Sequence, residues 1–218
     1  MCEEQNLTSG STGCLGSGSS AGQGGEGASG AQQAGGVNLA SQPSSASCKQ
    51  ISHPVALVIM GVAGTGKTTL AQALQSRLGW PYAEADAFHP AANIAKMSAG
   101  HPLNDEDRKP WLEALEKWME HKLDSGTSCL ITCSALKKKY RSVLEAAGNV
   151  HFIELDLDEE TLTERMQQRD HFMPVSLLRS QLATLESLSG DEPGIHLSSQ
   201  HSVDMLVQEC VEYMSSLA

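Results

Sequence analysis

Short apolar runs of strand length recur along the chain after residue 53. Residues 55–60 read V-A-L-V-I-M and end at a glycine, and similar runs lie at 128–133, 151–157 and, more weakly, 195–198. Runs that are apolar at successive positions predict strands covered on both faces of a sheet. A further strand is expected at 81–85, between the first and second of these runs.

Between the strands, apolar residues recur with the period of an α-helix. In residues 68–78 they fall at Leu70, Ala71, Leu74 and Leu78. The same period occurs at 111–123, 159–169, 176–188 and 203–217. Strands that alternate with helices predict β-α-β units, and therefore an α/β fold with a parallel sheet and helices on both of its faces.

One long polar connection interrupts this alternation. Residues 93–108 are rich in turn-forming residues, so we expect a loop that ends at a helix near Pro110, which Asp105 or Asp107 could cap. Trp111 and Trp118 lie seven residues apart on one stripe of that helix. Both are therefore predicted to lie in the core.

The first fifty residues differ from the rest in composition. They hold 11 of the 20 glycines and ten serines, lack aromatic residues and carry only four charges. A segment of this kind cannot bury enough apolar surface to offset the entropy lost on ordering. We therefore predict a disordered Gly/Ser-rich extension over residues 1–52 and one folded domain over 53–218.

Charge and composition argue against several classes of protein. The net charge is −11, and because the extension contributes −2, the folded domain carries −9, whereas nucleic-acid binders are normally basic. The sequence has no run of about 18 apolar residues, which argues against a membrane span. The six cysteines form no C-x-x-C pair, so we expect reduced thiols, no zinc site and a cytoplasmic protein.

The segment 61–68 reads G-V-A-G-T-G-K-T and fits the phosphate-binding pattern G-x-x-x-x-G-K-[ST] between a predicted strand and a predicted helix. Its glycines allow backbone N–H groups to wrap a phosphate chain, and the helix N-terminus adds its positive end. Lys67 is expected to reach the β- and γ-phosphates of ATP, and the Thr68 hydroxyl to bind Mg²⁺. The residues predicted to hold the nucleotide are Gly61, Val62, Ala63, Gly64, Thr65, Gly66, Lys67, Thr68 and Thr69.

This motif alone indicates a nucleotide, not a reaction, because motors, GTPases, transporters and kinases share it. A GTPase would be expected to carry the guanine-reading sequence N-K-x-D, which is not present. The domain is also short for an ATPase motor. A small-molecule kinase is favoured, and a glycine-rich turn that binds no ligand is the alternative.

Two carboxylates, Glu84 and Asp86, follow the second predicted strand. Open parallel sheets bind ligands at the carboxyl ends of their strands. One carboxylate could hold Mg²⁺ through water, and the other could orient an attacking hydroxyl or accept its proton. A pair of solvated loop acids is the alternative. Arg108, farther along, could grip a substrate carboxylate with two hydrogen bonds.

Three separated motifs resemble gluconokinases. They are D-A-F-H-P-A-A-N-I-A-K-M-S-A-G-H-P-L-N-D-E-D-R-K-P-W-L from Asp86, C-S-A-L-K-K-K-Y-R from Cys133 and R-D-H-F-M from Arg169. The resemblance covers essentially the whole folded domain. It implies a three-layer α/β/α P-loop kinase of the shikimate-kinase and nucleoside-monophosphate-kinase branch, with a five-stranded parallel sheet in the order 2-3-1-4-5 and a helical lid. It also implies Mg²⁺-dependent transfer of the ATP γ-phosphate to the 6-hydroxyl of D-gluconate, which feeds the pentose phosphate pathway.

The resemblance also implies roles for residues on the acceptor side. Asp86 matches the family's acceptor-binding aspartate and would orient the hydroxyl or act as the base. Glu84 stands where the family usually has aspartate, and its longer side chain still supplies an oxygen for a water-mediated contact with the metal. The other residues that would line the acceptor pocket are His89, Asn93, Lys96, Arg108, Ser134, Lys137 and Arg141. As alternatives, His89 could cap a turn, and Lys137 could belong to a solvated helix face.

Arg165 and Arg169 lie four residues apart on a predicted helix, so both project from one face. In the resembling kinases a lid closes over ATP here, and its arginines neutralise charge on the transferred phosphoryl group. The alternative is a pair of surface arginines matched by Glu160 and Glu164. His171 and Gln181 also occupy matching positions, without an assigned role.

Two rival functions remain open at this point. One is a kinase for another small hydroxy acid, such as shikimate, or for a nucleotide, against which the segment C-S-A-L-K-K-K-Y-R argues. The other is a nucleotide-binding regulator without chemistry, against which the intact Lys67, Thr68, Asp86 and lid arginines argue. A homodimer is possible, since relatives often dimerise.

Overall fold

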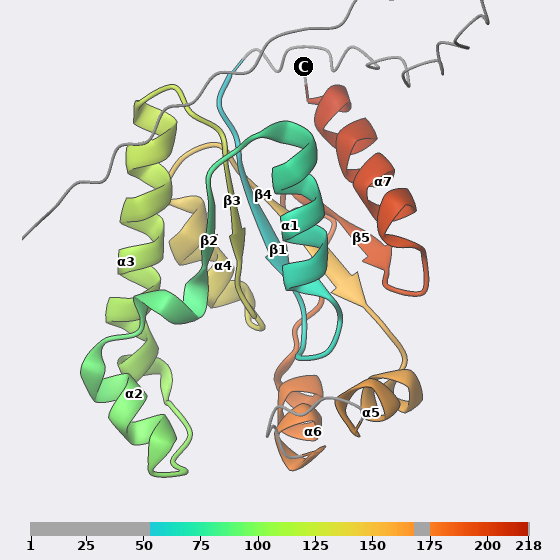
Figure 1. Cartoon of the computed structure of the whole chain (residues 1–218). Coiled ribbons are helices and arrows are strands. Elements are labelled where there is room, and N and C mark those ends of the chain that lie inside the picture. Colours follow the sequence, from blue (N-terminus) through green and yellow to red (C-terminus); the bar gives the residue numbers. More distant parts are fainter. Residues whose placement is uncertain (1–52, 168–174, 218) are drawn as a thin grey trace, which may run out of the picture. The chain divides into compact units, whose positions relative to one another are not determined.

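The computed structural model describes residues 53–167 and 175–217. The extension predicted for residues 1–52 lies outside the described residues, as do Arg169 and His171. Strands and helices alternate along the part that is described (Figure 1). In chain order the elements are β1 (Ala56–Met60), α1 (Lys67–Leu78), β2 (Tyr82–Glu84), the 3-10 helix η1 (Ala85–Phe88), α2 (Ala91–Ser98), α3 (Asp105–Asp124), β3 (Cys129–Thr132), α4 (Lys138–Glu145), β4 (Val150–Asp156), α5 (Glu159–Gln167), α6 (Val175–Thr184), β5 (Gly194–Ser198) and α7 (Val203–Ser216).

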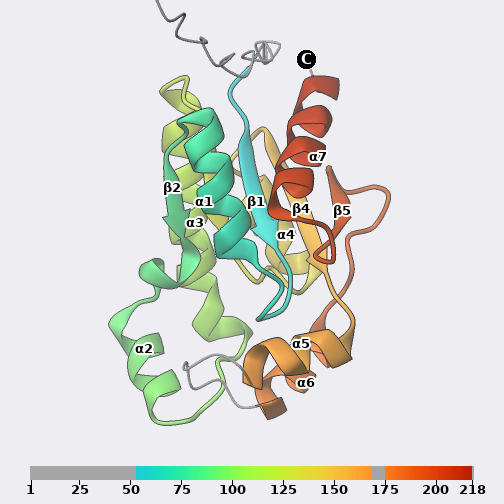
Figure 2. The ribbon, with the colours of Figure 1, turned by 45° about the vertical axis from the view of Figure 1, so that its right-hand side comes forward.

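The five strands form one parallel sheet in the order β2-β3-β1-β4-β5, which confirms the predicted fold class and strand order. The central strand β1 pairs with β3, where Val58 lies beside Ile131, and with β4, where Val58 lies beside Phe152. Because all the strands run in one direction, their carboxyl ends meet at one edge of the sheet. The loop after β1, helix α2 and helices α5 and α6 all lie at that edge (Figures 1 and 2).

Side chains of β1 point alternately into two cores, which explains why the strand is apolar at every position. Leu57 and Ile59 pack with buried residues of α1 and α7. Val58 and Met60 pack on the other face with buried residues of α3 and α4. A third, smaller cluster joins Val62 in the loop after β1 to Leu136, Leu162 and Leu178, and so anchors α5 and α6 at the sheet edge.

The stretch 93–108 is more helical than predicted. Helix α2, at residues 91–98, overlaps the first part of the expected loop, and α3 begins at Asp105, five residues before Pro110. Asn104 caps α3: its side chain accepts from the backbone N–H of Asp107, and the Asp107 carboxylate accepts from the N–H of Asn104. This reciprocal capping box satisfies two backbone donors at once. The predicted cap therefore moves to Asn104, with Asp107 as its partner.

Helix α6 is shorter than the predicted 176–188, since it ends at Thr184. Beyond it, backbone N–H groups leave the helical pattern: Glu186 donates to the Leu136 carbonyl at 2.7 Å, and Leu188 donates to the buried Glu154 carboxylate at 2.6 Å. The helix ends here because these N–H groups bond instead to the loop before α4 and to β4. Trp111 is buried and Trp118 packs at the edge of the same core, as expected.

The cysteines of the described residues, Cys129, Cys133 and Cys210, are buried free thiols. Burial raises the pKa of each thiol to about 12, so all three are protonated near neutral pH. Across residues 53–167 and 175–217, no helix combines the length and apolar character that a membrane crossing requires.

Candidate active site

The glycine-rich loop lies between β1 and α1, as predicted, and its backbone conformation requires glycine. Gly61 has a φ of 133°, and a Cβ atom there would lie 2.5 Å from the carbonyl oxygen of Leu155 on β4. Gly66 is the left-handed N-cap of α1, with a φ of 91°, and no described side chain caps this helix. Its first N–H groups can therefore serve an anion, as at other phosphate-binding helix ends.

Hydrogen bonds to backbone carbonyls hold the loop in shape. The Thr65 hydroxyl donates to the Val62 carbonyl at 3.0 Å, and the Lys67 ammonium donates to the same oxygen at 2.8 Å. From the loop after β5, the Ser199 hydroxyl donates to the Thr65 carbonyl at 2.6 Å. Sequence reasoning missed Ser199 because no local pattern links it to a loop 134 residues earlier.

Gln181 on α6 contacts the loop directly. Its side-chain oxygen accepts a hydrogen bond from the backbone N–H of Ala63 at 2.7 Å. The sequence marked Gln181 as a matching position without a role. The structure gives it a contact: it ties α6 to one of the backbone donors of the glycine-rich loop.

Glu84 ends β2 beside Thr132 of β3, so its carboxylate lies at the same sheet edge. It accepts hydrogen bonds from the hydroxyls of Tyr82 and Thr132. Burial, followed by the contact with Glu84, raises the pKa of Tyr82 to about 12, which keeps this hydroxyl a donor. Two hydroxyls thus orient Glu84, and neither was singled out from the sequence.

Asp86 lies two residues farther on, in η1, and its side chain is 95% exposed. The Nε2 atom of His89 lies 4.0 Å from its carboxylate, whereas the His89 side chain is itself only 8% exposed. The imidazole stacks on Trp111 with ring centres 4.5 Å apart. Burial lowers the pKa of His89, so the ring is neutral near pH 7. Asp86 is therefore the exposed member of the pair, and His89 is the buried one, which packs on Trp111 beside it.

Asn93 and Lys96, on α2, both contact the start of α3. The buried Asn93 amide donates to the Asp107 carbonyl oxygen at 2.7 Å. The Lys96 ammonium lies 2.5 Å from the Asp107 carboxylate and remains partly exposed. These contacts fix the position of α2 against α3, and they place both predicted acceptor residues beside Asp107 at the start of α3.

Arg108 and Lys137 come from different elements and meet around one aromatic ring. The guanidinium of Arg108 lies 5.7 Å from the centre of the Tyr140 ring, and the Lys137 ammonium lies 5.6 Å from it. One Arg108 N–H donates to the Leu103 carbonyl at 2.6 Å. Ser134, in the same loop as Lys137, accepts through its carbonyl from the Gly61 N–H at 3.4 Å.

Arg141 was predicted to line the acceptor pocket, but the structure places its side chain in the core. Its side chain is fully buried and forms a two-bond ion pair with Glu192, at 2.5 Å and 2.9 Å. It also donates to the carbonyls of Ala135 and Glu186. The guanidinium therefore points into the core, because α4 turns this side of the basic run inward. It fastens the segment between α6 and β5 to α4.

Arg165 lies on α5, and its guanidinium donates to the Ser199 carbonyl at 3.1 Å. This contact joins α5 to the residue that supports the glycine-rich loop. Helices α5 and α6 are linked further by an exposed contact of 3.5 Å between Arg179 and Glu159. Arg169, the second predicted lid arginine, lies outside the described residues.

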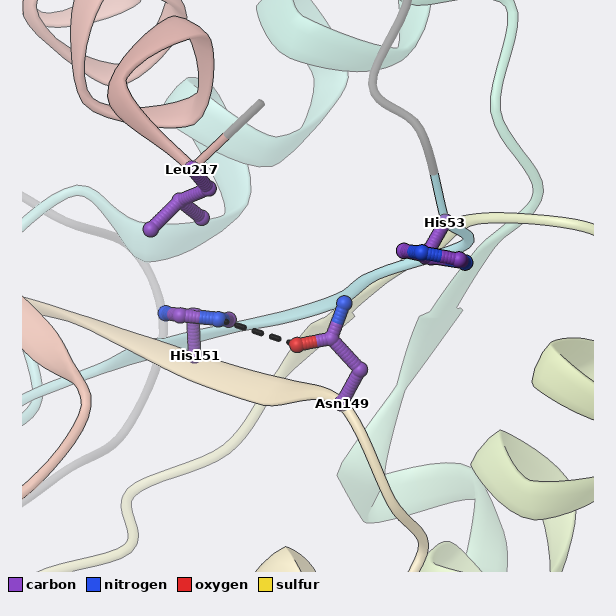
Figure 3. Close-up of a pocket in the computed structure, with 4 residues that line it drawn as sticks. All are labelled: His53, Asn149, His151 and Leu217. Carbon is purple, nitrogen blue, oxygen red and sulfur yellow. Dashed lines mark hydrogen bonds between the residues drawn. The ribbon is translucent and has the colours of Figure 1, made fainter.

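A separate hollow of about 380 Å³ lies at the opposite edge of the sheet, lined by His53, Asn149, His151 and Leu217 (Figure 3). The polar groups of Asn149 and His151 form hydrogen bonds with each other or with nearby residues. The Asn149 amide contacts the Pro54 carbonyl and His151, and the other His151 nitrogen lies 2.7 Å from the Tyr213 hydroxyl. None of the predicted site residues lines it, so we place the candidate active site at the glycine-rich loop instead.

Comparison with known proteins identifies the family of this chain. Residues 57–172 match the family model described as AAA domain. A gluconokinase from Gluconobacter oxydans is 46% identical over 165 residues, which cover 75% of this chain and 93% of the relative.

Solved structures give the same result. A sugar kinase from Janibacter superposes with a TM-score of 0.70 at 46% identity, covering 76% of this chain and 98% of that one. A gluconokinase from Sinorhizobium meliloti superposes with a TM-score of 0.68 at 40% identity, covering 76% and 94%. With this fold, these motifs and this degree of identity, the chain belongs to the gluconokinase family.

Proposed function

We propose that this chain transfers the γ-phosphoryl group of ATP to the 6-hydroxyl of D-gluconate, yielding 6-phospho-D-gluconate and ADP. The observation that carries the proposal is that a phosphate loop and an open carboxylate, Asp86, share one sheet edge in a chain that is 46% identical to a gluconokinase. A product of this kind would feed the pentose phosphate pathway.

On the donor side, the backbone N–H groups of residues 61–69 would surround the phosphates, and Lys67 would neutralise the β- and γ-phosphates. Lys67 would exchange its contact with the Val62 carbonyl for these oxygens. Arg165, with Arg169 beyond the described residues, would offset charge that develops on the transferred group. Catalysis would then consist mainly of positioning and electrostatics.

The side chains near the loop suit Mg²⁺, because Thr68, Glu84 and Asp86 supply hard oxygen donors. A carboxylate offers about four acceptor positions, and Tyr82 and Thr132 use two of those on Glu84. Glu84 can therefore still hold a metal-bound water, while Thr68 would bind the ion directly. The ion would supply charge neutralisation between the phosphates.

On the acceptor side, Asp86 would align the 6-hydroxyl or accept its proton, because its carboxylate is open whereas the nearby His89 side chain is covered. Ser134, Asn93 and Lys96 would line the sugar chain. Arg108 and Lys137 would meet the carboxylate of the acid. Arg141 has no place in this arrangement.

An ADP-release assay tests the proposal. Gluconate should stimulate ADP release, whereas shikimate, AMP and buffer alone should not, and coupling to 6-phosphogluconate dehydrogenase should show that position 6 is phosphorylated. Lys67→Ala should lose at least about a hundredfold in rate. Lys138→Ala is the matched control, since that lysine pairs with Asp191 outside the loop. Equal rates with and without gluconate would contradict the proposal.

Two further expectations remain predictions. Cytoplasmic location can be tested by fractionating cells and probing for the protein. A homodimer can be tested by light scattering after size-exclusion chromatography, where a mass near 46 kDa, twice the 23.2 kDa chain, would support it and a mass near 23 kDa would not.

A further inference from the structure

Three cations, two of which belong to predicted acceptor residues, lie around the ring of one buried tyrosine. Tyr140, on α4, is 7% exposed. Its ring centre lies 5.7 Å from the guanidinium of Arg108, 5.6 Å from the ammonium of Lys137 and 5.8 Å from that of Lys139. Cations within about 6 Å of an aromatic face are attracted to it. One ring therefore holds together cations from α3 and from the start of α4.

One carboxylate, that of Asp105, contacts this cluster directly, while the Asp107 carboxylate beside Arg108 pairs with Lys96. The Tyr140 hydroxyl donates to Asp105 at 2.5 Å, and the other carboxylate oxygen lies 2.5 Å from Lys139. Lys137 lies 3.6 Å from the same group. Hydrogen bonds from Lys139 and then Tyr140 hold the pKa of Asp105 well below its usual range, so it is ionised. The cluster thus keeps an excess of positive charge, which suits an anionic ligand.

The tyrosine hydroxyl acts as a donor in this cluster. Burial, and then its contact with Asp105, raises the pKa of Tyr140 to about 12. The proton therefore stays on the hydroxyl near neutral pH, and the hydrogen bond fixes the ring relative to the first residue of α3. Arg108, on α3, and Lys137, the residue before α4, are held in one relative position as a result.

We propose that Tyr140 and Asp105 are positioning residues that aim Arg108 and Lys137 at the carboxylate of the acceptor. The proposal rests on the function proposed above and adds to it a source of selectivity for an acid over a neutral polyol. A guanidinium has five N–H donors, and the bond to Leu103 uses one of them, so Arg108 can still bind a carboxylate.

A purely structural role for Tyr140 leads to different expectations. If the ring only packed α3 against α4, its loss would lower stability and disturb both substrates alike. If the ring positions the two cations, its loss should weaken the binding of the acid acceptor and leave ATP binding unchanged. The ratio of kcat/KM for an acid acceptor to kcat/KM for a neutral acceptor separates the two roles, since only the acid binds the cations.

The experiment compares Tyr140→Leu, which removes the ring, with Tyr140→Phe, which removes only the hydroxyl. Tyr140→Leu should raise KM for gluconate about tenfold, and Tyr140→Phe about threefold, with KM for ATP within about twofold of wild type. The ratio of kcat/KM for gluconate to that for sorbitol, its neutral analogue, should fall in the same order. Tyr213→Phe is the control, because its hydroxyl contacts His151 at the opposite sheet edge.

Each outcome decides the matter. If KM for gluconate stays within about twofold in both variants, or KM for ATP rises in parallel, the positioning role is wrong while the proposed function stands. If the wild type shows no gluconate-dependent turnover, both proposals fail. If Tyr140→Leu does not fold, Tyr140→Phe decides alone: a selective rise in KM for gluconate supports the role, and unchanged kinetics overturn it.

Discussion

The buried ion pair between Arg141 and Glu192 supports a quantitative prediction about stability. The Glu192 side chain is 4% exposed and accepts two hydrogen bonds from Arg141 and two from Ser189. The contact with Arg141 is the largest cause that lowers the pKa of Glu192 from 4.5 to about 2. Since one pKa unit equals about 1.4 kcal/mol, this difference corresponds to about 3 kcal/mol of folding free energy.

Glu192→Gln removes the charge and nearly preserves the shape, so it leaves Arg141 buried without a counter-ion. We expect the free energy of unfolding at pH 7 to fall by about 3 to 5 kcal/mol, which agrees with the value from the pKa. Urea denaturation followed by tryptophan fluorescence measures this. Asp191→Asn is the matched control: its pair with Lys138 is exposed, so its loss should change the free energy of unfolding far less than Glu192→Gln does.

The pH dependence gives a second test of the same pair. A carboxylate whose pKa is lowered by folding contributes fully above its unfolded pKa of 4.5 and loses its contribution as the pH falls toward about 2. The difference in stability between wild type and Glu192→Gln should therefore shrink from pH 5 downward. A Glu192→Gln protein within about 1 kcal/mol of wild type at pH 7, or a difference that does not vary with pH, would refute the reasoning.

Three further substitutions test the site. Asp86→Asn should lower kcat by about 10² to 10⁴ with KM for ATP unchanged, and an unaffected kcat in steady-state assays would remove Asp86 from its role. Gln181→Ala should raise KM for ATP about three- to tenfold by deleting the bond to Ala63, whereas KM for gluconate stays constant. A KM for ATP equal to that of the wild type would show that the contact does not support the loop. Gly61→Ala should lower the free energy of unfolding by about 1 to 3 kcal/mol, because its Cβ meets the Leu155 carbonyl. In the same denaturation series Gly190→Ala, with open space around it, should change little.

The parts of the molecule that the sequence predicted well are those with local signals. The strand of residues 56–60 and the loop after it are readable because burial on two faces and the phosphate-binding pattern both act over a few neighbouring positions. The order of the strands came instead from the family resemblance, since periodicity does not determine which strands pair.

The errors involve contacts that are distant in the chain or that compete with turn formation. Helix α2 was missed because its residues were grouped with the turn-forming residues that follow it, although its own alanines, lysine and methionine favour a helix. The buried contact between Asn93 and Asp107 stabilises it further. The Asn104 cap could have been found from its spacing to Asp107. Arg141 lies in a basic run whose sequence does not say which side faces the core, and its partner Glu192 is 51 residues away.

The glycine-rich loop is braced by segments made much later in synthesis. Gly61 lies against Leu155 of β4, and Ser199 holds the Thr65 carbonyl from a distance of 134 residues along the chain. A nascent chain that has emerged only through β3 already contains the complete nucleotide motif but neither of these supports. Nucleotide affinity should therefore appear late during translation, once β4, β5 and the loop that carries Ser199 have joined the sheet.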